Sequence, residues 1–106
     1  MSHHAQILIV DDEPDHAEVM AEALQRLGHV CTVVDGLESA RSELTLGSFD
    51  LVITDMVMEE EDSGLKVLAL AREHQDSCAT IVVTAHGDIP TAKASLKGGA
   101  YDFIEK

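Results

Sequence analysis

Short, unbroken apolar runs alternate along this chain with stretches in which apolar residues recur every three or four positions. The runs have the character of strands that are buried on both faces of a sheet, and they cover residues 6–10, 30–34, 51–53, 80–83 and 101–104. The helical periodicity between them predicts helices at residues 14–27, 37–46, 65–74 and 89–97. Strand and helix therefore alternate along the chain.

Helix boundaries are marked by proline and aspartate. Pro14 suits a first helical turn. Asp88 is placed as the N-cap of the last helix, whose inner face is expected to carry Ile89, Ala92 and Leu96. Alternating strands and helices with short loops favour one α/β domain over the whole 106 residues, with a doubly wound parallel sheet covered by helices on both faces.

Polar residues directly follow four of the predicted strands. They are Asp11, Asp12 and Glu13 after the first strand, Asp55 after the third, Thr84 after the fourth and Lys106 after the fifth. In open parallel sheets, ligands bind beyond the carboxyl ends of the strands, where the strand order reverses. By analogy with flavodoxin-like folds the order is 2-1-3-4-5, which would bring Asp11, Asp12 and Asp55 together. Taken singly, each is explained as a turn, cap or terminal residue; their convergence is not.

A cluster of carboxylates would weaken a small domain unless a cation neutralised it, because like charges repel strongly at short range. Carboxylate oxygens suit Mg²⁺, which prefers octahedral oxygen ligands and usually shares them with a phosphate. An Asp carboxylate can attack phosphorus and hold an acyl phosphate. An ammonium can neutralise a phosphoryl oxygen. These residue types therefore point to Mg²⁺-assisted phosphoryl transfer to Asp55.

Composition narrows the class of partner. Seven Lys and Arg against 20 Asp and Glu give a net charge of −13, so we expect this domain to bind neither nucleic acid nor anionic membranes directly. No apolar run approaches the ~18 residues of a membrane span, no signal-peptide pattern opens the sequence, and a cytoplasmic location is expected. Cys31 and Cys78 lack the spacing of a metal site and are expected to stay reduced.

Four segments together resemble the receiver domains of bacterial two-component response regulators: ILIVDDEP, DLVITDM, IVVTAHGD and GAYDFIEK. The strings TAHGDIPTA and GAYDFIEK are most similar to receivers of nitrogen-regulation-type enhancer-binding activators. The resemblance covers essentially the whole chain and implies the flavodoxin-like fold with strand order 2-1-3-4-5. It also implies a sensor histidine kinase as phosphodonor and a switching surface that regulates a downstream output, which we expect to be transcription.

The resemblance carries over to the acidic residues one by one. Asp55 would be the phosphoacceptor. Asp11 and Asp12 would be the acidic pair that binds Mg²⁺ together with Asp55, and the backbone carbonyl of Val57 would be a further ligand.

The remaining roles fall on the last two strands. By the same resemblance, Thr84 would be the switch hydroxyl, Lys106 the phosphate-binding lysine and Phe103 the switch aromatic. His86 and Val57 occupy positions at which receivers tune the lifetime of the phosphate, although both are equally explained as loop residues.

Three further histidines, His16, His29 and His74, lie on the predicted helices or at their ends. They are interpreted as surface residues.

The loop after Asp55 departs from the family pattern. Glu59 stands where receivers commonly have proline, and Gly64 lies nine positions beyond Asp55 instead of eight. The loop is therefore one residue longer, and its tip, residues 59–62, is acidic throughout. We interpret these charges as a solvated loop; the alternative is that they slow phosphotransfer by repelling the incoming phosphate.

The family continues beyond the position of Lys106 with a fifth helix, which this chain lacks. One face of the sheet should therefore keep only the first helix as cover, so apolar surface is expected near strands three to five. We expect the intact protein to carry further sequence, including an output domain, or to borrow the missing helix from another chain. A homodimer is left open.

Two other classes of function compete with this interpretation. An interaction module that is never phosphorylated has no reason to hold clustered like charges, which argues against it. A phosphohydrolase turning over through an aspartyl phosphate would carry Asp-x-Asp after the first strand, where this chain has Asp11 and Glu13, and the sequence has no insertion to form a substrate pocket.

Overall fold

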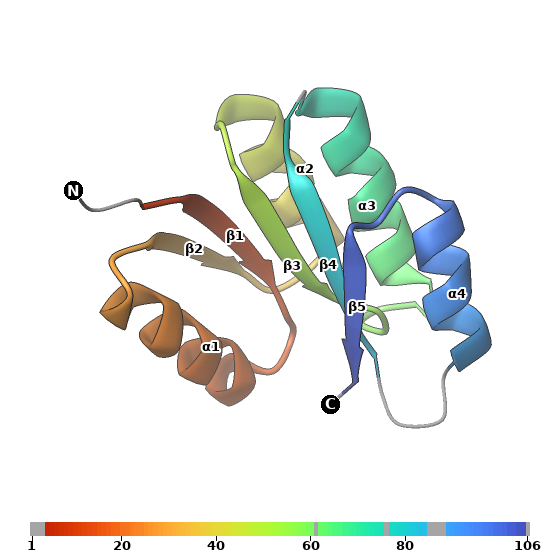
Figure 1. The fold of residues 1–106 in the computed structure, drawn as a ribbon, viewed down its shortest axis with the longest axis horizontal. Helices are drawn as coiled ribbons and strands as arrows, with labels where there is room; N and C mark the ends of the chain where they lie inside the picture. Colours follow the sequence, from red (N-terminus) through yellow and green to blue (C-terminus); the bar gives the residue numbers. More distant parts are fainter. Residues whose placement is uncertain (1–3, 61, 76, 85–88, 106) are drawn as a thin grey trace.

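The computed structural model describes residues 4–60, 62–75, 77–84 and 89–105. The strands within these ranges are β1 (Gln6–Val10), β2 (Val30–Val34), β3 (Leu51–Asp55), β4 (Ala79–Thr84) and β5 (Asp102–Glu105). The helices are α1 (Pro14–Arg26), α2 (Leu37–Leu46), α3 (Ser63–His74) and α4 (Ile89–Lys97). The elements alternate as the hydrophobic pattern predicts (Figure 1).

All five strands form one parallel sheet in the order β2-β1-β3-β4-β5, which confirms the predicted order. In this sheet β2 lies on one side of β1, whereas β3, β4 and β5 are added in turn on the other side. The order therefore reverses between β1 and β3, whose last paired residues are Val10 and Thr54. Ligands of open α/β sheets bind beyond the strands at such a reversal.

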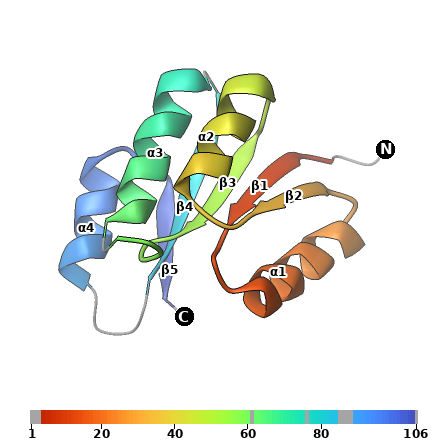
Figure 2. The same cartoon turned by 180° about the vertical axis from the view of Figure 1, so that it is seen from behind.

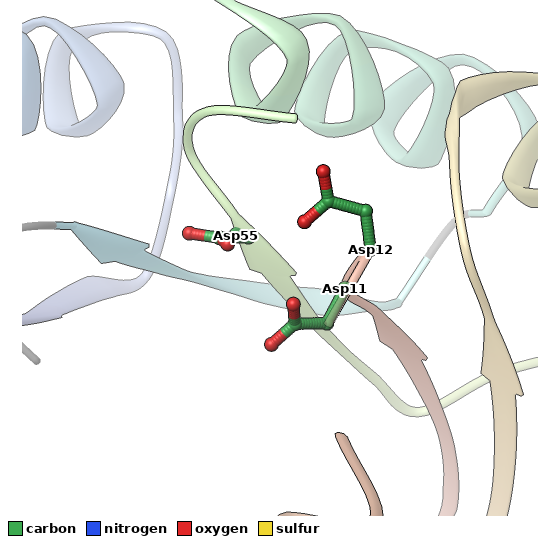
Figure 3. Close-up of side chains that lie close together, drawn as sticks. All are labelled: Asp11, Asp12 and Asp55. Atoms are coloured by element: carbon green, nitrogen blue, oxygen red, sulfur yellow. The ribbon is translucent and has the colours of Figure 1, made fainter. Parts of the chain in front are cut away.

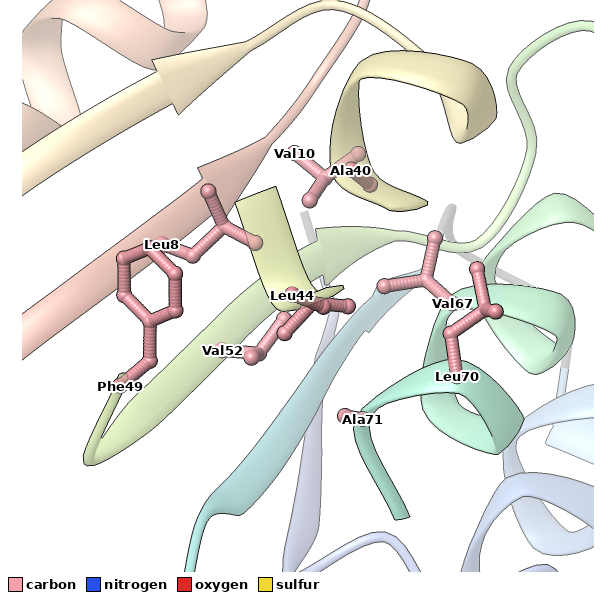
Figure 4. Close-up of a cluster of buried hydrophobic side chains, with 9 residues drawn as sticks. All are labelled: Leu8, Val10, Ala40, Leu44, Phe49, Val52, Val67, Leu70 and Ala71. Atoms are coloured by element: carbon pink, nitrogen blue, oxygen red, sulfur yellow. The ribbon is translucent and has the colours of Figure 1, made fainter. Parts of the chain in front are cut away.

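Side chains that alternate along β1 divide the core between the two faces of the sheet. Leu8 and Val10 pack with α2 and α3, whereas Ile7 and Ile9 pack against α1. Figures 1 and 2 show α1 alone on one face and the other three helices on the opposite face. Figure 4 shows the larger cluster, in which Leu44 of α2 lies over the sheet. This division arises because successive side chains of a strand point to opposite faces of the sheet, and here both faces are buried.

The face covered by α1 is the more open one, as expected for a sheet with a single helix on that side. Ile104 of β5, paired with Val83 of β4, is 52% exposed. Ile53 and Val83 lie nearer to α1 and remain 9% and 6% exposed. The predicted apolar surface is therefore present at β5, whereas β3 stays covered.

Several sequence-based details are wrong in the structure. Helix α3 begins at Ser63, two residues earlier than predicted, so that Gly64 lies within it. On α4, Leu96 is 41% exposed and the buried side chain is its neighbour Ser95, so the predicted inward position of Leu96 is incorrect. Asp88 lies outside the described residues, and so do the side chains of Ile89 and Ala92.

One side chain ties the carboxyl ends of α2 and α3 together. The amide nitrogen of Gln75, the residue that ends α3, donates hydrogen bonds to the carbonyls of Leu44 and Gly47, at 2.8 and 2.9 Å. Its amide oxygen accepts a hydrogen bond of 3.0 Å from the backbone N–H of Phe49. A single glutamine thus satisfies three backbone groups that a helix end and its following loop would otherwise leave to water.

Cys31 and Cys78 are free thiols in this structure. Burial raises the pKa of both, and that of Cys78 rises to about 11, with the Asp50 carboxylate adding to the effect. Within the described residues, every helix is too short or too polar to cross a bilayer.

Candidate functional site

Three aspartates converge where β1 and β3 end, as the sequence predicts. Asp11 follows β1 directly and Asp55 is the last residue of β3. Asp11, Asp12 and Asp55 each place one carboxylate oxygen within 4.8 Å of the others (Figure 3). Asp11 and Asp55 are 2% and 5% exposed, whereas Asp12 faces solvent. The cluster is therefore a pair of buried acids with an exposed third at its mouth.

Asp11 is held in place from the first turn of α1. Its Oδ1 accepts a hydrogen bond of 2.9 Å from the Glu13 N–H, and its Oδ2 lies 2.5 Å from His16 Nδ1. Because an ionised carboxylate only accepts hydrogen bonds, Nδ1 is the donor. The His16 side chain is 35% exposed and so lies at the surface as predicted, but it also bonds to Asp11. His29 is likewise partly exposed, and its Nδ1 accepts the Ala5 N–H at 3.0 Å.

The loop after Asp55 folds back so closely that only glycine fits at its end. The Gly64 N–H donates to the Met56 carbonyl at 2.8 Å. A Cβ on Gly64 would lie 2.7 Å from Met56 Cα and 2.8 Å from the Asp55 carbonyl oxygen. The extra residue relative to the family pattern therefore lies before Gly64, and this glycine packs directly on the end of β3.

The acidic tip of that loop has specific partners and is not simply solvated. Glu59 Oε1 accepts a hydrogen bond of 2.8 Å from the Leu37 N–H, at the start of α2. Glu60 pairs with Lys66 Nζ at 2.9 Å, and this hydrogen bond raises the pKa of Lys66. Ser63, 1% exposed, bridges the tip by donating to the Glu60 carbonyl at 2.9 Å.

Thr84 ends β4 one residue beyond Val83, the pairing partner of Asp55. The Thr84 side chain is fully buried, and its Oγ1 has no hydrogen-bond partner among the described residues. A buried hydroxyl without a partner costs about 1–3 kcal/mol, so its retention favours a ligand that accepts its hydrogen. Phe103 of β5 is half-buried against the cluster formed by Met56, Leu68, Val82 and Ala100.

Two predicted residues, Lys106 and His86, lie outside the described part of the chain. The phosphate-binding role of Lys106 therefore stays a prediction. Val57 is 44% exposed and stands two residues beyond Asp55, in the segment that leads away from the cluster.

The donor set fits a hard divalent cation. Three carboxylates at one point repel each other, and a bound cation would turn that repulsion into ligation. All are oxygen donors, as Mg²⁺ and Ca²⁺ require, and the exposed Asp12 leaves a side open to solvent and substrate. The Thr84 hydroxyl, which has no partner in the described part of the chain, adds a donor suited to an anion.

Comparisons with known proteins agree on the kind of domain. The family model for the response regulator receiver domain matches residues 7–106. The nitrogen assimilation regulatory protein NtrX of Azorhizobium caulinodans is 34% identical over 107 residues, covering 100% of this chain and 23% of that protein. The transcriptional regulatory protein GlrR of Escherichia coli is 37% identical over 108 residues, covering 100% and 24%.

A solved structure has the same fold. A response regulator protein from Burkholderia pseudomallei, described with a phosphorylated aspartic acid, a calcium ion and citrate, superposes with a TM-score of 0.87 at 26% identity, over 95% of this chain and 59% of that one. The chain spans about a quarter of the length of the curated relatives named above.

Proposed function

Because this chain belongs to the response regulator receiver family, we propose that Asp55 accepts a phosphoryl group in a Mg²⁺-dependent reaction. The observation that carries this proposal is the convergence of Asp11, Asp12 and Asp55 beside a buried Thr84 hydroxyl that lacks a partner among the described residues. A sensor histidine kinase is the proposed donor. The domain assists its own phosphorylation and dephosphorylation but is not an enzyme acting on a separate substrate.

The acidic residues would bind the Mg²⁺ ion. Asp11, Asp12 and Asp55 would hold the ion through carboxylate oxygens, with the Val57 carbonyl as a further ligand. When bound, Mg²⁺ offsets the negative charge that gathers on the phosphoryl oxygens. Asp11 is oriented by its hydrogen bonds to Glu13 and His16, so little reorganisation is needed when the ion binds.

The transfer itself needs one nucleophile. An Asp55 carboxylate oxygen forms a bond to phosphorus as the bond between phosphorus and the donor nitrogen breaks, and the bonding electron pair leaves with the imidazole. Burial of Asp55 would limit the access of bulk water to the acyl phosphate to the side that the exposed Asp12 leaves open. We assign Lys106 to one phosphoryl oxygen and the Thr84 hydroxyl to another.

The Thr84 contact would convert phosphorylation into a change of shape. If the Thr84 hydroxyl can reach an acceptor only in the phosphorylated domain, the phosphate stabilises the conformation in which that hydrogen bond forms. Such a preference for one of two conformations is what a population shift requires. Phe103, at the margin of the cluster around Leu68, would change its packing with it. The surface formed by β4, α4 and β5 would then act on an output domain or partner.

The output we propose is regulation of transcription in the cytoplasm, by analogy with the regulators that this chain resembles. With a net charge of −13, the domain would not contact DNA or an anionic membrane itself. It would act through another domain or through a second copy.

The direct test is incubation with acetyl phosphate and Mg²⁺, followed by intact mass measurement. We expect one acid-stable, alkali-labile phosphoryl group per chain, and none when EDTA replaces Mg²⁺. A folded sample that gains no adduct would refute the proposal. Release of phosphate from small esters over many turnovers would instead identify a phosphohydrolase.

Replacing Thr84 by Ala should leave the adduct but remove the response. The amide chemical shifts of β4, α4 and β5 should change on phosphorylation in the wild type and stay near their unmodified values in Thr84→Ala. Thr84→Ser, which keeps the hydroxyl, is the matched control and should respond. Equal shift changes in the Ala and wild-type proteins would exclude the switch role.

A further inference from the structure

The inserted loop after Asp55 is fastened to a neighbouring helix by one carboxylate. Glu59 Oε1 accepts the Leu37 N–H at 2.8 Å, in the first turn of α2. The N-cap of α2 is Gly36, which offers no side-chain cap of its own. Glu59 therefore caps α2 from a position 22 residues away, and a carboxylate in this place is also favoured by the helix dipole.

Gly36 makes room for this contact. A Cβ built on Gly36 would lie 2.8 Å from Glu59 Oε1. The Gly36 φ of −177° is extended backbone that any residue can adopt, so the absence of a side chain here serves space and not conformation. Because the nearest atom is the mobile end of the Glu59 side chain, a methyl group at residue 36 would displace Glu59 without straining the backbone.

The fastened segment leads directly from the acidic cluster. Glu59 follows Asp55 by four residues and Val57 by two. At its far end the loop is closed by the Gly64–Met56 hydrogen bond, and its tip is closed by Ser63. Between the end of β3 and the tip, Glu59 makes a side-chain hydrogen bond to another element, and the neighbouring Met58 packs against the core cluster that includes Leu44 and Val67. The Glu59 bond therefore adds to the contacts that limit how far the backbone at Val57 can move.

We propose that Glu59 is a positioning residue for the divalent cation site: by tying the loop to α2, it restricts the movement of the Val57 carbonyl, which the proposed function assigns as a further ligand. The inference rests on the proposed function, since it assigns Glu59 to the same site. In this assignment Glu59 acts through the loop and is a ligand of neither the ion nor the phosphate. It replaces, by a hydrogen bond, the stiffness that the commoner proline would give this position.

A simpler effect must be separated from this one, because removing any acidic residue near the site lowers its attraction for a cation. Glu60 provides the control. It stands next to Glu59 and carries the same charge, but its carboxylate pairs with Lys66 and not with α2. Glu59→Ala and Glu60→Ala therefore lose the same charge and the same side-chain atoms, and only the first loses the link.

The experiment measures Mg²⁺ affinity calorimetrically and amide hydrogen exchange at Leu37 without metal. We expect Glu59→Ala to weaken Mg²⁺ binding about tenfold, the lower range for loss of a residue that orients metal ligands. Glu60→Ala should weaken it by less than about threefold. Glu59→Gln keeps a carbonyl acceptor for the Leu37 N–H and should recover most of the affinity. Gly36→Ala should resemble Glu59→Ala, and the double variant should be no weaker than either.

Each result decides the question. Glu59→Ala could show faster Leu37 exchange but the same Mg²⁺ affinity as Glu60→Ala. Glu59 would then be a helix cap without a role at the cation site, and the inference would be overturned. Unchanged Leu37 exchange would show that the bond is not formed in solution and would also overturn it. A wild type that binds no Mg²⁺ would remove the proposed function and this inference together, while Leu37 exchange would still report the cap alone.

Discussion

Asp55→Asn should take up no phosphoryl group from acetyl phosphate at any Mg²⁺ concentration, while the domain stays folded. Asn has nearly the shape of Asp, so the packing at the end of β3 is kept. Its amide, however, lacks the anionic oxygen that attacks phosphorus. It also removes one of the three carboxylates of the cluster, so Mg²⁺ should stabilise the variant less than the wild type. Intact mass and the Mg²⁺ dependence of the melting temperature measure the two effects.

Asp50→Asn is the matched control, because Asp50 immediately precedes the same strand at its opposite end. Its Oδ2 accepts the Gln6 N–H at 2.8 Å, far from the acidic cluster along β3. This variant should take up phosphate like the wild type. An adduct on Asp55→Asn of the same yield and alkali lability as on the wild type would place the acceptor elsewhere.

Gly64→Ala should destabilise the domain by about 1–2 kcal/mol, although alanine normally favours a helix. Helix propensity alone would gain at most about 1 kcal/mol. Against this, the new Cβ would meet the backbone of Met56 and Asp55 at 2.7 and 2.8 Å. Overpacking costs about 1–3 kcal/mol, and contact with backbone cannot be relieved by rotating a side chain. The end of β3 would have to move, so we also expect weaker Mg²⁺ binding.

Gly98→Ala tests whether the cost is specific to Gly64. The atoms nearest to a Cβ on Gly98 would be Leu68 Cδ2, at 3.3 Å, and two carbonyl oxygens at 3.5 Å, and the methyl of a leucine can give way. Its stability should stay within about 1 kcal/mol of the wild type. Since the chain has no tryptophan, urea unfolding followed by circular dichroism is the suitable measurement. Equal stabilities for the two variants would contradict the close approach at Gly64.

Much of this fold follows from the sequence because the signals are local and repeated. The run Ile7–Val10 is apolar at every position, as a strand covered on both faces must be, and the structure buries all four residues. The convergence of Asp11 and Asp55 could be predicted once the strand order was taken by analogy, because parallel strands end at the same edge of a sheet. The order itself came from the resemblance and not from periodicity.

What sequence reasoning missed are contacts made by single side chains across folded space. His16 is the third residue of α1, and side chains in a first turn point back toward the end of the preceding strand; that direction could have suggested its bond to Asp11. The partner of Glu59 could not be inferred, because 22 residues separate it from Leu37. The inward position predicted for Leu96 was wrong because the spacing of apolar residues cannot show that the smaller Ser95 is the residue turned inward.

Helix α2 is held at both ends by side chains from the segment that follows it. At the N-terminus of α2, Glu59 accepts a hydrogen bond from the Leu37 N–H. At its C-terminus, Gln75 donates one to the Leu44 carbonyl. A ten-residue helix is too short to be stable alone in water. We therefore expect α2 to form only after β3 and α3 are in place, which means after the rate-limiting transition state of folding. Substitutions that weaken α2 should therefore speed unfolding and leave the refolding rate nearly unchanged.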